Sequence, residues 1–367
     1  MMLELDSLTH RYGTESAVDD ASFGVGEGEL VALLGPSGCG KTTIVQAVAG
    51  HVRPTAGRVK LRGADVTDSP PESRGISVVF QQSTLYPHMT VAENVAYGLK
   101  ACGVESNRRA DVVSEYLELV DLQEQRDAYP SELSGGQRRR VELARAVAPE
   151  PDVLLLDEPL SALDRSLRER LRDEIARIQR ETGVTTLFVT HDQEEAMALA
   201  DRLVVMDDGS VAGTGEPRPL YESPPTPFVA SFLGRSNELS ATVTRQAPLT
   251  LTVGGQEVVL SDSRADVSTG SAVSCHVRPE NLTLGSVSTL SSDAPAVSVP
   301  GTVTRVADMG RRYDVTVRLE SEEAVIVERT EMPPATGESV SVGLLEADLT
   351  IFGAGRSDRL GVDVSST

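Results

Sequence analysis

The chain has 367 residues, of which 40% are hydrophobic, and its 34 Lys and Arg against 55 Asp and Glu give a formal net charge of −21. This length suggests two domains or three, and this apolar content can bury a core, which argues against wholesale disorder. The acidity also argues against a nucleic-acid-binding surface, because such a surface needs clustered basic residues.

The negative charge is spread along the whole chain: residues 1–235 carry a net charge of −13 and residues 236–367 a net charge of −8. Only three lysines occur, against 31 arginines. This balance is typical of proteins from salt-accumulating halophiles, where dense salt screens the repulsion between like charges. An acidic protein from a GC-rich mesophile is the alternative.

The cysteine content fits a reducing, cytosolic setting, because the three cysteines, Cys39, Cys102 and Cys275, are too few for a disulfide framework. The longest apolar runs, Leu30–Leu34 and Val153–Leu156, are far shorter than the ~20 residues that a membrane-spanning helix needs. We also expect no signal peptide, because the chain does not begin with a basic region followed by an apolar stretch.

The first 235 residues alternate apolar strands with amphipathic helices. The expected strands are short and β-rich, as in a mostly parallel buried sheet: Leu30–Leu34, Val153–Leu156 and Thr186–Val189. Between them we expect a loop over Gly35–Gly40, a helix over Thr42–Ala49 that stops at Gly50, a helix-rich insert over Val91–Ala148, and a helix over Arg165–Glu181. The last of these has one apolar stripe, formed by Leu167, Leu171, Ile175 and Ile178.

The composition changes after Ser223–Pro227, which is typical of a linker, and Phe228–Gly234 predicts one more short helix. From Leu239 onward Val and Thr alternate with polar residues, which predicts strands over Ala241–Thr244, Leu249–Val253, Val273–Val277, Thr302–Val306, Val315–Leu319 and Val325–Val327. We expect a loop over Ser286–Pro300. The sequence therefore predicts an α/β domain over residues 1–235 and an all-β domain over residues 236–367.

A glycine-rich motif follows the first strand and opens the first helix. It matches G-x-x-x-x-G-K-[ST] and consists of Gly35, Pro36, Ser37, Gly38, Cys39, Gly40, Lys41, Thr42 and Thr43. Its glycines let backbone N–H groups point at phosphate oxygens, and the helix N-terminus adds a positive dipole end. Lys41 would neutralise the β- and γ-phosphates, and the Thr42 hydroxyl would bind Mg²⁺.

A second motif ends the strand Val153–Leu156 with two carboxylates, Asp157 and Glu158. Ligands bind at the carboxyl ends of strands in a parallel sheet, so Asp157 can reach the Mg²⁺ held by Thr42. Glu158 could polarise the attacking water as a general base.

A third motif, Leu133 to Gln137, has Ser134 as a helix N-cap, with the helix beginning near Arg138, and two glycines that let backbone amides approach an anion. One phosphate does not need two anion-binding loops, this one and the glycine-rich loop, on the same chain. A symmetric dimer, in which each loop faces the nucleotide of the other subunit, accounts for both.

Together these motifs resemble ATP-binding-cassette (ABC) ATPases over residues 1–235. The resemblance includes Gln81, the Leu-Ser-Gly-Gly-Gln signature with Ser134, Gly135, Gly136 and Gln137, the run from Ser161 to Asp164, and the run from Val189 to Asp192. It implies that Tyr12 stacks on adenine and that Gln81 touches Mg²⁺ and water and senses the membrane partner. It further implies that Asp164 bridges two subunits and that His191 contacts the γ-phosphate.

Two local features have alternative interpretations. Cys39, inside the phosphate-binding loop, is interpreted as a small filler and not as a redox switch. Arg138, Arg139 and Arg140 form a basic run that departs from the glutamine-rich pattern common after the signature. We interpret this run as a solvated helix face.

The stretch Phe80–Val95 and the stretch His191–Ala196 look like importer ATPases for sugars, polyamines, ferric iron and oxyanions. Those proteins carry a C-terminal transport-associated OB (TOBE) domain, and the run His276–Glu280 resembles its Arg-Pro-Glu motif. The functional interpretation of that domain is dimer contact or regulation by solute; the alternative is a stabilising appendage. Phe232–Asn237 looks more like the iron and polyamine members, while a sugar importer of the maltose, xylose or arabinose type is the alternative.

The resemblance thus implies the ATP-hydrolysing subunit of an importer, peripheral on the cytoplasmic face of the membrane. It would form a homodimer that binds ATP and Mg²⁺, close against two membrane-spanning permease subunits, and serve an extracytoplasmic solute-binding protein indirectly. A soluble, non-transport ABC ATPase is the competing class; such proteins usually fuse two cassettes or insert a long coiled coil, and neither is visible here.

Overall fold

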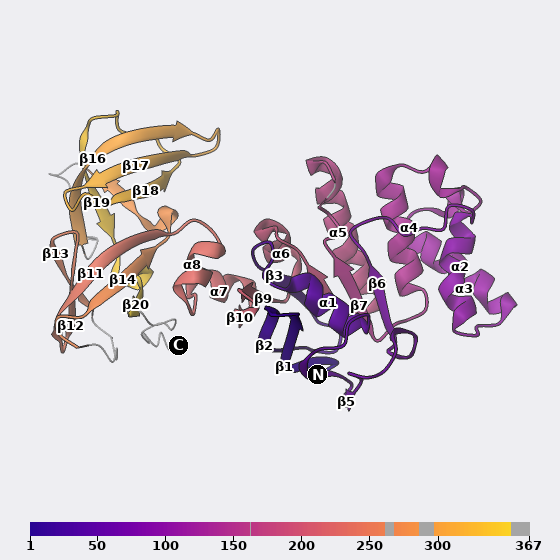
Figure 1. The fold of residues 1–367 in the computed structure, drawn as a ribbon. Helices are drawn as coiled ribbons and strands as arrows, with labels where there is room; N and C mark the ends of the chain where they lie inside the picture. Colours follow the sequence, from indigo (N-terminus) through magenta and orange to yellow (C-terminus); the bar gives the residue numbers. More distant parts are fainter. Residues whose placement is uncertain (162, 261–267, 286–296, 354–367) are drawn as a thin grey trace. The chain divides into compact units, whose positions relative to one another are not determined.

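The computed structural model describes residues 1–161, 163–260, 268–285 and 297–353 (Figure 1). By its internal contacts the chain divides into two compact units, Met1–Leu220 and Tyr221–Thr367, which are described separately. The domain boundary expected between residues 235 and 236 stays a prediction. In the described residues, no helix is both long enough and apolar enough to span a membrane.

A six-stranded sheet forms the centre of the first unit. Its order is β10-β9-β3-β8-β7-β6, and its neighbouring strands are parallel except for β10, which is antiparallel to β9. The strands are β3 (Leu30–Leu34), β6 (Ile76–Val79), β7 (Val153–Asp157), β8 (Thr185–Val189), β9 (Arg202–Asp207) and β10 (Ser210–Gly215). Every residue of β3 and β8 is buried, which confirms the mostly parallel buried sheet predicted from short apolar runs.

A second, antiparallel sheet in this unit has the order β2-β1-β4-β5. Its strands are β1 (Leu3–Tyr12), β2 (Glu15–Val25), β4 (Ala56–Leu61) and β5 (Ala64–Asp65). One core cluster joins buried side chains from the two sheets and the first helix, among them Leu5, Leu33 and Ile44. The helix that follows the glycine-rich loop is therefore held from both sides by apolar packing.

The helices of the first unit follow the expected plan. They are α1 (Lys41–Ala49), α2 (Val91–Ala101), α3 (Ser106–Leu119), α4 (Gly135–Val147), α5 (Arg165–Thr182) and α6 (Gln193–Leu199), and α7 (Pro217–Glu222) runs across the division between the units. Helix α1 ends at Gly50 with φ 83°, the left-handed cap that its position predicted. The insert between β6 and β7 contains α2, α3 and α4, as expected. In α5, Leu171, Ile175 and Ile178 are buried.

The start of α4 corrects one expectation. The helix begins at Gly135 and not near Arg138, so both glycines of the signature lie in its first turn. Ser134 is the N-cap, as predicted: its hydroxyl accepts the N–H of Gln137 at 3.2 Å, while the Gln137 side chain accepts the N–H of Ser134 at 2.9 Å. This capping box, with glutamine at its third position, is what lets the helix begin so early.

The basic run that follows is not a solvated face, and that interpretation was wrong. Arg139 is only 6% exposed and pairs with the buried Glu142. Arg138 and Arg140 are half-buried and donate to the carbonyls of Leu133 and Val120. Three arginines in a row occupy different sides of a helix, and each one here finds an acceptor on a neighbouring segment.

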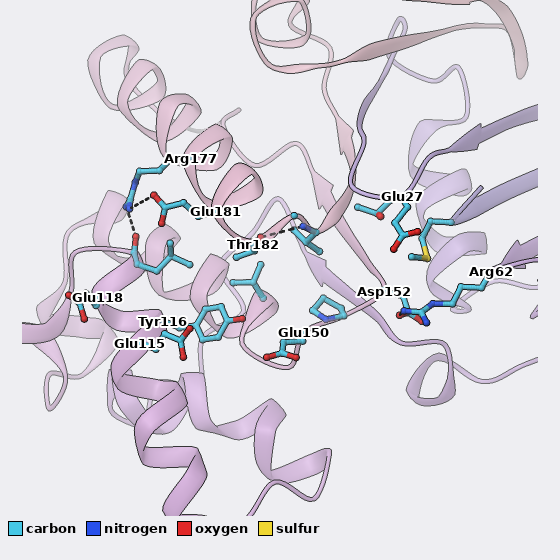
Figure 2. A pocket seen from close by; sticks show the side chains of 17 residues that line it. Glu27, Arg62, Glu115, Tyr116, Glu118, Glu150, Asp152, Arg177, Glu181 and Thr182 are labelled. Atoms are coloured by element: carbon cyan, nitrogen blue, oxygen red, sulfur yellow. Dashed lines mark hydrogen bonds and ion pairs between the residues drawn. The ribbon is translucent and has the colours of Figure 1, made fainter.

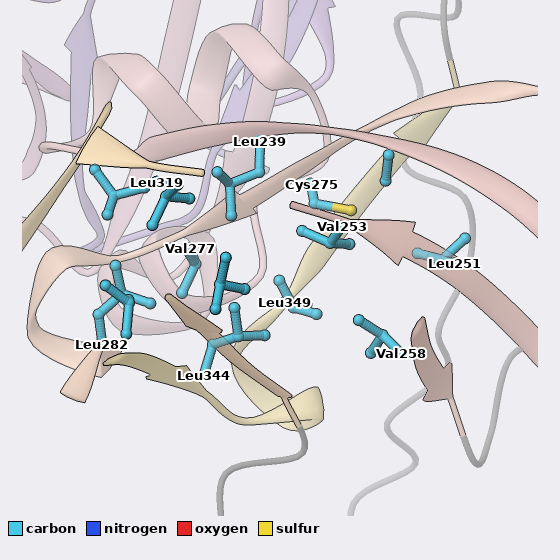
Figure 3. Close-up of a cluster of buried hydrophobic side chains, with 14 of the residues drawn as sticks. Leu239, Leu251, Val253, Val258, Cys275, Val277, Leu282, Leu319, Leu344 and Leu349 are labelled. Carbon is cyan, nitrogen blue, oxygen red and sulfur yellow. The ribbon is translucent and has the colours of Figure 1, made fainter. Parts of the chain in front are cut away.

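In the residues that the structure describes, the second unit contains two five-stranded antiparallel sheets. Buried side chains from both sheets form one apolar core, part of which is drawn in Figure 3. Their orders are β13-β12-β11-β14-β20 and β15-β19-β16-β17-β18. The strands are β11 (Asn237–Gln246), β12 (Leu249–Val253), β13 (Gln256–Leu260), β14 (Ala272–Val277), β15 (Thr283–Gly285), β16 (Val297–Asp308), β17 (Tyr313–Leu319), β18 (Ala324–Arg329), β19 (Ser339–Leu344) and β20 (Thr350–Gly353). The unit is thus the β-rich, OB-like domain expected from the alternating Val and Thr pattern.

A loop was expected over Ser286–Pro300, and residues 286–296 of it lie outside the described residues. Residues 297–300 begin β16 and pair with β19, so the expectation was wrong for these four. Pro300 had favoured a loop, but a proline is compatible with strand positions that do not need its missing N–H.

Arg278 of the Arg-Pro-Glu run anchors the segment that begins the second unit. Its guanidinium donates to the carbonyls of Ala230 at 2.7 Å, Tyr221 at 2.9 Å and Arg235 at 3.1 Å, and it stacks 4.0 Å from the centre of the Tyr221 ring. Ala230 belongs to α8 (Pro227–Phe232), the short helix predicted from sequence. Burial lowers the pKa of Arg278, and five fixed donors on one planar group suit several carbonyls at once.

We expect Arg278→Ala to lower the free energy of unfolding of the second unit by about 3 kcal/mol, because it leaves one buried and two partly buried carbonyls without their charged donor. Calorimetry of the full chain would measure the change. Arg318→Ala is the matched control, since the Arg318 side chain is 61% exposed and its contact with the exposed Glu322 carboxylate is a long one, at 3.5 Å. Equal unfolding transitions for the two variants would contradict the anchoring role.

Candidate functional site

The glycine-rich loop connects β3 to α1 and curls around the Lys41 side chain. The Lys41 ammonium group donates to the carbonyls of Gly35 at 2.7 Å and Pro36 at 2.9 Å. Gly40 has φ 100°, and a Cβ atom there would lie 2.2 Å from the Ala17 carbonyl oxygen, so only glycine fits. The loop is therefore preformed. Lys41 donates hydrogen bonds to two of its carbonyl oxygens, and anionic oxygens of a ligand could replace them as acceptors.

Cys39 packs inside this loop. The thiol is buried, burial raises its pKa, and a Cβ atom on Gly35 would lie 2.6 Å from its Sγ. A raised pKa disfavours the thiolate that redox chemistry requires. These observations favour the interpretation of Cys39 as a small filler of the loop.

Asp157 and Glu158 lie at the carboxyl end of β7, at the same edge of the sheet as the glycine-rich loop. The Glu158 N–H donates to the Val189 carbonyl of β8 at 2.9 Å, and Glu158 itself adopts φ 44°. Burial, with the adjacent Glu158 charge as a second cause, raises the pKa of Asp157, while Lys41 acts in the opposite direction. Two carboxylates and one ammonium group thus meet at this edge.

Two residues predicted for the site, Gln81 and His191, contact a third, Glu158. Gln81 donates from Nε2 to Glu158 Oε2 at 3.3 Å, and His191 Nδ1 lies 3.2 Å from Glu158 Oε1. Gln81 also donates to the Ser161 hydroxyl at 3.2 Å. The side chains of residues 81, 158 and 191 come from the ends of three neighbouring strands, so the sheet order β8-β7-β6 is what assembles them.

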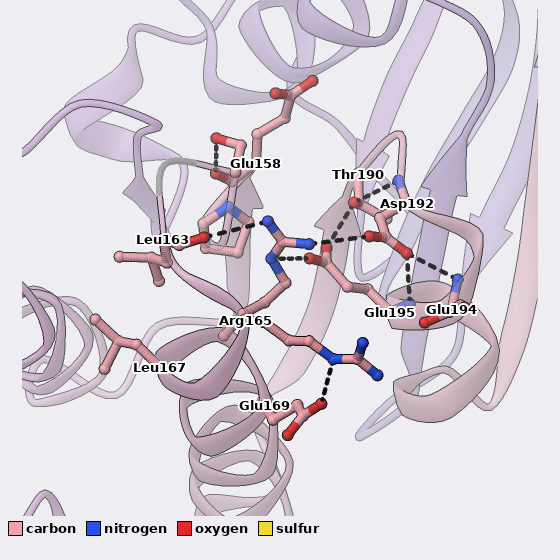
Figure 4. Close-up of polar contacts among 12 residues, drawn as sticks. Glu158, Leu163, Arg165, Leu167, Glu169, Thr190, Asp192, Glu194 and Glu195 are labelled. Carbon is pink, nitrogen blue, oxygen red and sulfur yellow. Dashed lines mark hydrogen bonds and ion pairs between the residues drawn. The ribbon is translucent and has the colours of Figure 1, made fainter. Parts of the chain in front are cut away.

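A polar network links the loop before α5 to the loop that carries His191 (Figure 4). Arg168 donates to the Leu163 carbonyl at 3.2 Å and lies 3.5 Å from the Asp192 carboxylate and 3.6 Å from the Glu195 carboxylate. Glu195 in turn accepts the Thr190 hydroxyl at 2.7 Å. Both neighbours of His191 in the chain are therefore fixed by side chains.

The remaining predicted residues lie elsewhere in the unit. Tyr12 is 52% exposed at the end of β1, and its hydroxyl reaches Gln46 of α1 at 3.4 Å. Residues 134–137 begin α4, which Figure 1 shows beside α2 and α3. Asp164 is the N-cap of α5 and accepts the Leu167 N–H at 3.0 Å. Ser134 of the signature and Asp164 therefore each cap the N-terminus of the helix that follows them.

A cavity of about 690 Å³ lies away from this site (Figure 2). It is lined by Glu115, Tyr116, Glu150 and Asp152 among others, at the amino ends of β7 and β8. Burial raises the pKa of Tyr116 to about 12. Asp157 and Glu158 lie at the carboxyl end of β7, whereas the cavity lies at its amino end. The cavity is therefore not part of the candidate site.

Sequence reasoning missed the residues that hold the site in place. Arg139, Arg168 and Glu195 each contact a segment that carries a predicted site residue. The basic run gave a signal for Arg139, but it was interpreted as exposed. No sequence motif distinguished Arg168 from the other arginines of its charged helix.

Comparison with known proteins agrees with these observations. The ABC transporter family model matches residues 18–161, and the TOBE domain model matches residues 275–352. The chain is 44% identical over 332 residues to the spermidine/putrescine import ATP-binding protein PotA of Thermobifida fusca, which covers 89% of this chain and 85% of that protein.

Two other relatives are named for different substrates. The sulfate/thiosulfate import ATP-binding protein CysA 2 of Chromobacterium violaceum is 45% identical over 309 residues, which cover 83% of each chain. The Fe(3+) ions import ATP-binding protein FbpC 1 of Pectobacterium atrosepticum is 40% identical over 341 residues, which cover 92% of this chain and 93% of the relative.

Proposed function

The chain belongs to the family of ABC importer ATP-binding subunits. From this premise we propose how its residues bind ATP, hydrolyse it and couple the hydrolysis to transport. As a member of this family it is an ATPase. The observation that carries the proposal is the convergence of Gln81, Glu158 and His191 beside the preformed phosphate-binding loop.

The nucleotide binds along the loop that opens α1. The loop amides from Gly35 to Thr43 cradle the phosphates, and the Lys41 ammonium leaves its carbonyl acceptors for the β- and γ-phosphate oxygens. Tyr12 stacks on adenine with its exposed ring. The aromatic face offers stacking energy and little base specificity.

Mg²⁺ fits the residues at the edge of the sheet. The ion prefers one or two carboxylates together with substrate phosphates, and Thr42, Gln81 and Asp157 offer a hydroxyl, an amide oxygen and a carboxylate. The raised pKa of Asp157 reflects burial and a second negative charge, and a nearby cation would offset both. When bound, the ion would neutralise charge on the phosphate oxygens.

Glu158 acts as the general base that orients and deprotonates the attacking water. His191 and Gln81 fix its carboxylate from two sides, at 3.2 Å and 3.3 Å. His191 is 54% exposed in its side chain, so its ring can also reach a γ-phosphate in front of it. The positive φ of Glu158 and its N–H bond to Val189 keep the carboxylate at the strand end.

The functional unit is a homodimer. The first-turn N–H groups of α4, at Gly135 and Gly136, have no intrahelical acceptors and suit an anion. The nucleotide of the same chain is already held by the loop before α1, so the signature and Asp164 serve the nucleotide of a second copy. ATP then favours the closed dimer because its γ-phosphate touches both subunits only in that state.

The membrane partners contact the helical region of the first unit. A groove of about 740 Å³ is lined by His88, Met89, Tyr97, Lys100 and others. These residues come shortly after Gln81 in the sequence. The Tyr97 ring is exposed and packs 4.6 Å from the ring centre of Tyr86. Two permease subunits would each place a short segment in such a groove. The ATPase would thus sit peripherally on the cytoplasmic face, and the extracytoplasmic binding protein would act only through the permeases.

We expect Tyr97→Glu to release the chain from membranes, because it places a charge in the apolar part of this groove. The measurement is the fraction of the chain that sediments with membranes in cells containing the permease subunits. Tyr129→Glu is the matched control, since Tyr97 and Tyr129 are both 46% exposed. Sedimentation that is equal for the two variants would contradict this contact surface.

The cargo is most simply ferric iron or a polyamine. The relatives at 40% and 44% identity are named for import of Fe(3+) ions and of spermidine and putrescine, although the relative at 45% identity is named for import of sulfate and thiosulfate. The test is uptake of ferric iron, spermidine, sulfate and two sugars by a strain that lacks this gene. Selective loss of iron or spermidine uptake supports the proposal, and selective loss of sulfate or sugar uptake contradicts it.

A further inference from the structure

We propose that the buried Arg139–Glu142 pair of α4 is a positioning pair that couples the signature helix to Gln81 and Glu158 of the same chain. The inference rests on the roles proposed above for those two residues. It goes beyond them, because neither Arg139 nor Glu142 belongs to a motif that implies a function.

Arg139 reaches the residues next to both site side chains. Its Nη1 donates to the Phe80 carbonyl at 2.7 Å, directly before Gln81, and its Nε donates to the Pro159 carbonyl at 2.9 Å, directly after Glu158. Nη1 also lies 2.7 Å from Glu142 Oε2. One planar guanidinium group therefore fixes the ends of β6 and β7 to α4.

Glu142 holds the same loop at a second point. Its Oε1 accepts the Thr84 N–H at 2.9 Å, while Oε2 receives Arg139. Arg145, one turn further along α4, donates to the Thr84 carbonyl at 2.8 Å and to its hydroxyl at 2.5 Å. The loop containing Gln81 is thus attached to α4 both before and after that residue.

The burial of the pair argues for positioning and against a merely stabilising role. Arg139 and Glu142 are 6% and 2% exposed. Well-packed apolar residues of similar volume often give equal or greater stability than a buried ion pair, because the charges lose their hydration. What apolar side chains cannot supply is the directed set of bonds to Phe80, Pro159 and Thr84.

The position of the pair on α4 indicates that it transmits movement of this helix to Gln81 and Glu158. Arg139 lies five residues after Ser134, so it follows the first turn of the helix whose N-terminus is proposed to meet the partner's nucleotide. A shift of α4 on dimer closure would move the backbone on both sides of the catalytic pair. Displacement of a catalytic group by about 1 Å can cost up to ~100-fold in rate.

The test compares Arg139→Lys with the double variant Arg139→Gln/Glu142→Gln in the full chain. Lysine keeps the charge beside Glu142 but lacks the planar fork, and the double variant removes both buried charges together. We expect each to lower kcat for ATP hydrolysis by at least about tenfold, with KM for ATP changed by less than about twofold. Arg140→Gln is the matched control on the same helix, because the Arg140 side chain donates to the Val120 carbonyl and, among the described residues, to no segment that carries a predicted site residue.

Circular dichroism would establish which variants are folded at the assay temperature. Wild-type kcat in a folded lysine or double variant would overturn the proposal, as would an equal loss in Arg140→Gln. The outcome is distinguishable from a failure of the proposed site, because Glu158→Gln tests that site independently. If Glu158→Gln stops hydrolysis while the Arg139 variants retain it, only the coupling inference fails.

Discussion

Glu158→Gln is expected to lower kcat for ATP hydrolysis by at least about 100-fold while ATP still binds, because removal of a general base typically costs ~10² to 10⁴-fold. Glutamine keeps the shape of the side chain and can still contact Gln81 and His191, but it cannot accept a proton. Since the γ-phosphate then remains in place, an ATP-loaded dimer should accumulate. Steady-state phosphate release and light scattering after gel filtration measure the two effects.

Glu194→Gln is the matched control for this experiment. Glu194 is exposed in the first turn of α6, and Figure 4 shows it near the same network. Its substitution should leave kcat and the mass of the particle unchanged. A Glu158→Gln variant that turns over ATP normally, and that stays monomeric with ATP, would contradict the role given to Glu158.

Lys41→Ala is expected to weaken ATP binding by at least about 100-fold, because it removes the only ammonium group in the phosphate-binding loop. The charge-assisted contacts to the β- and γ-phosphates have no other donor of that kind in the loop. The chain contains no tryptophan, so titration calorimetry or a fluorescent ATP analogue would measure the affinity.

Lys60→Ala controls for the loss of a positive charge in so acidic a chain. Lys60 lies on β4 and pairs with Glu4 and Asp6, each at 3.0 Å. Its substitution should leave ATP affinity unchanged. Tight binding retained by Lys41→Ala would contradict the interpretation of the glycine-rich loop as the phosphate site.

The parts of the fold that sequence predicted are those where local pattern and tertiary environment agree. Leu30–Leu34 is a run of apolar residues in a central parallel strand, so its pattern alone identifies it. Gly50 ends α1 because the left-handed conformation needed there favours glycine. The resemblance to ABC ATPases also pointed to Gln81 and His191, and each of them lies within hydrogen-bonding distance of the Glu158 carboxylate.

The parts that sequence did not predict depend on neighbours that are distant in the chain. Short strands such as Thr283–Gly285 carry too few residues for a periodic pattern, and pairing with Ser341–Gly343 defines them. Arg139 looks solvated in a basic run, yet its burial depends on Phe80 and Pro159, which are distant in sequence. Burial of a charged residue becomes visible only when the partners that satisfy it are known.

We infer that ATP hydrolysis, with Glu158 as the general base, drives import. Solute uptake should be measured in a strain that lacks this gene, complemented with the wild-type chain or with Glu158→Gln at equal expression. We expect the wild-type chain to restore uptake of one solute and Glu158→Gln to restore none. Restoration of uptake by both chains would show that import does not depend on hydrolysis at this site.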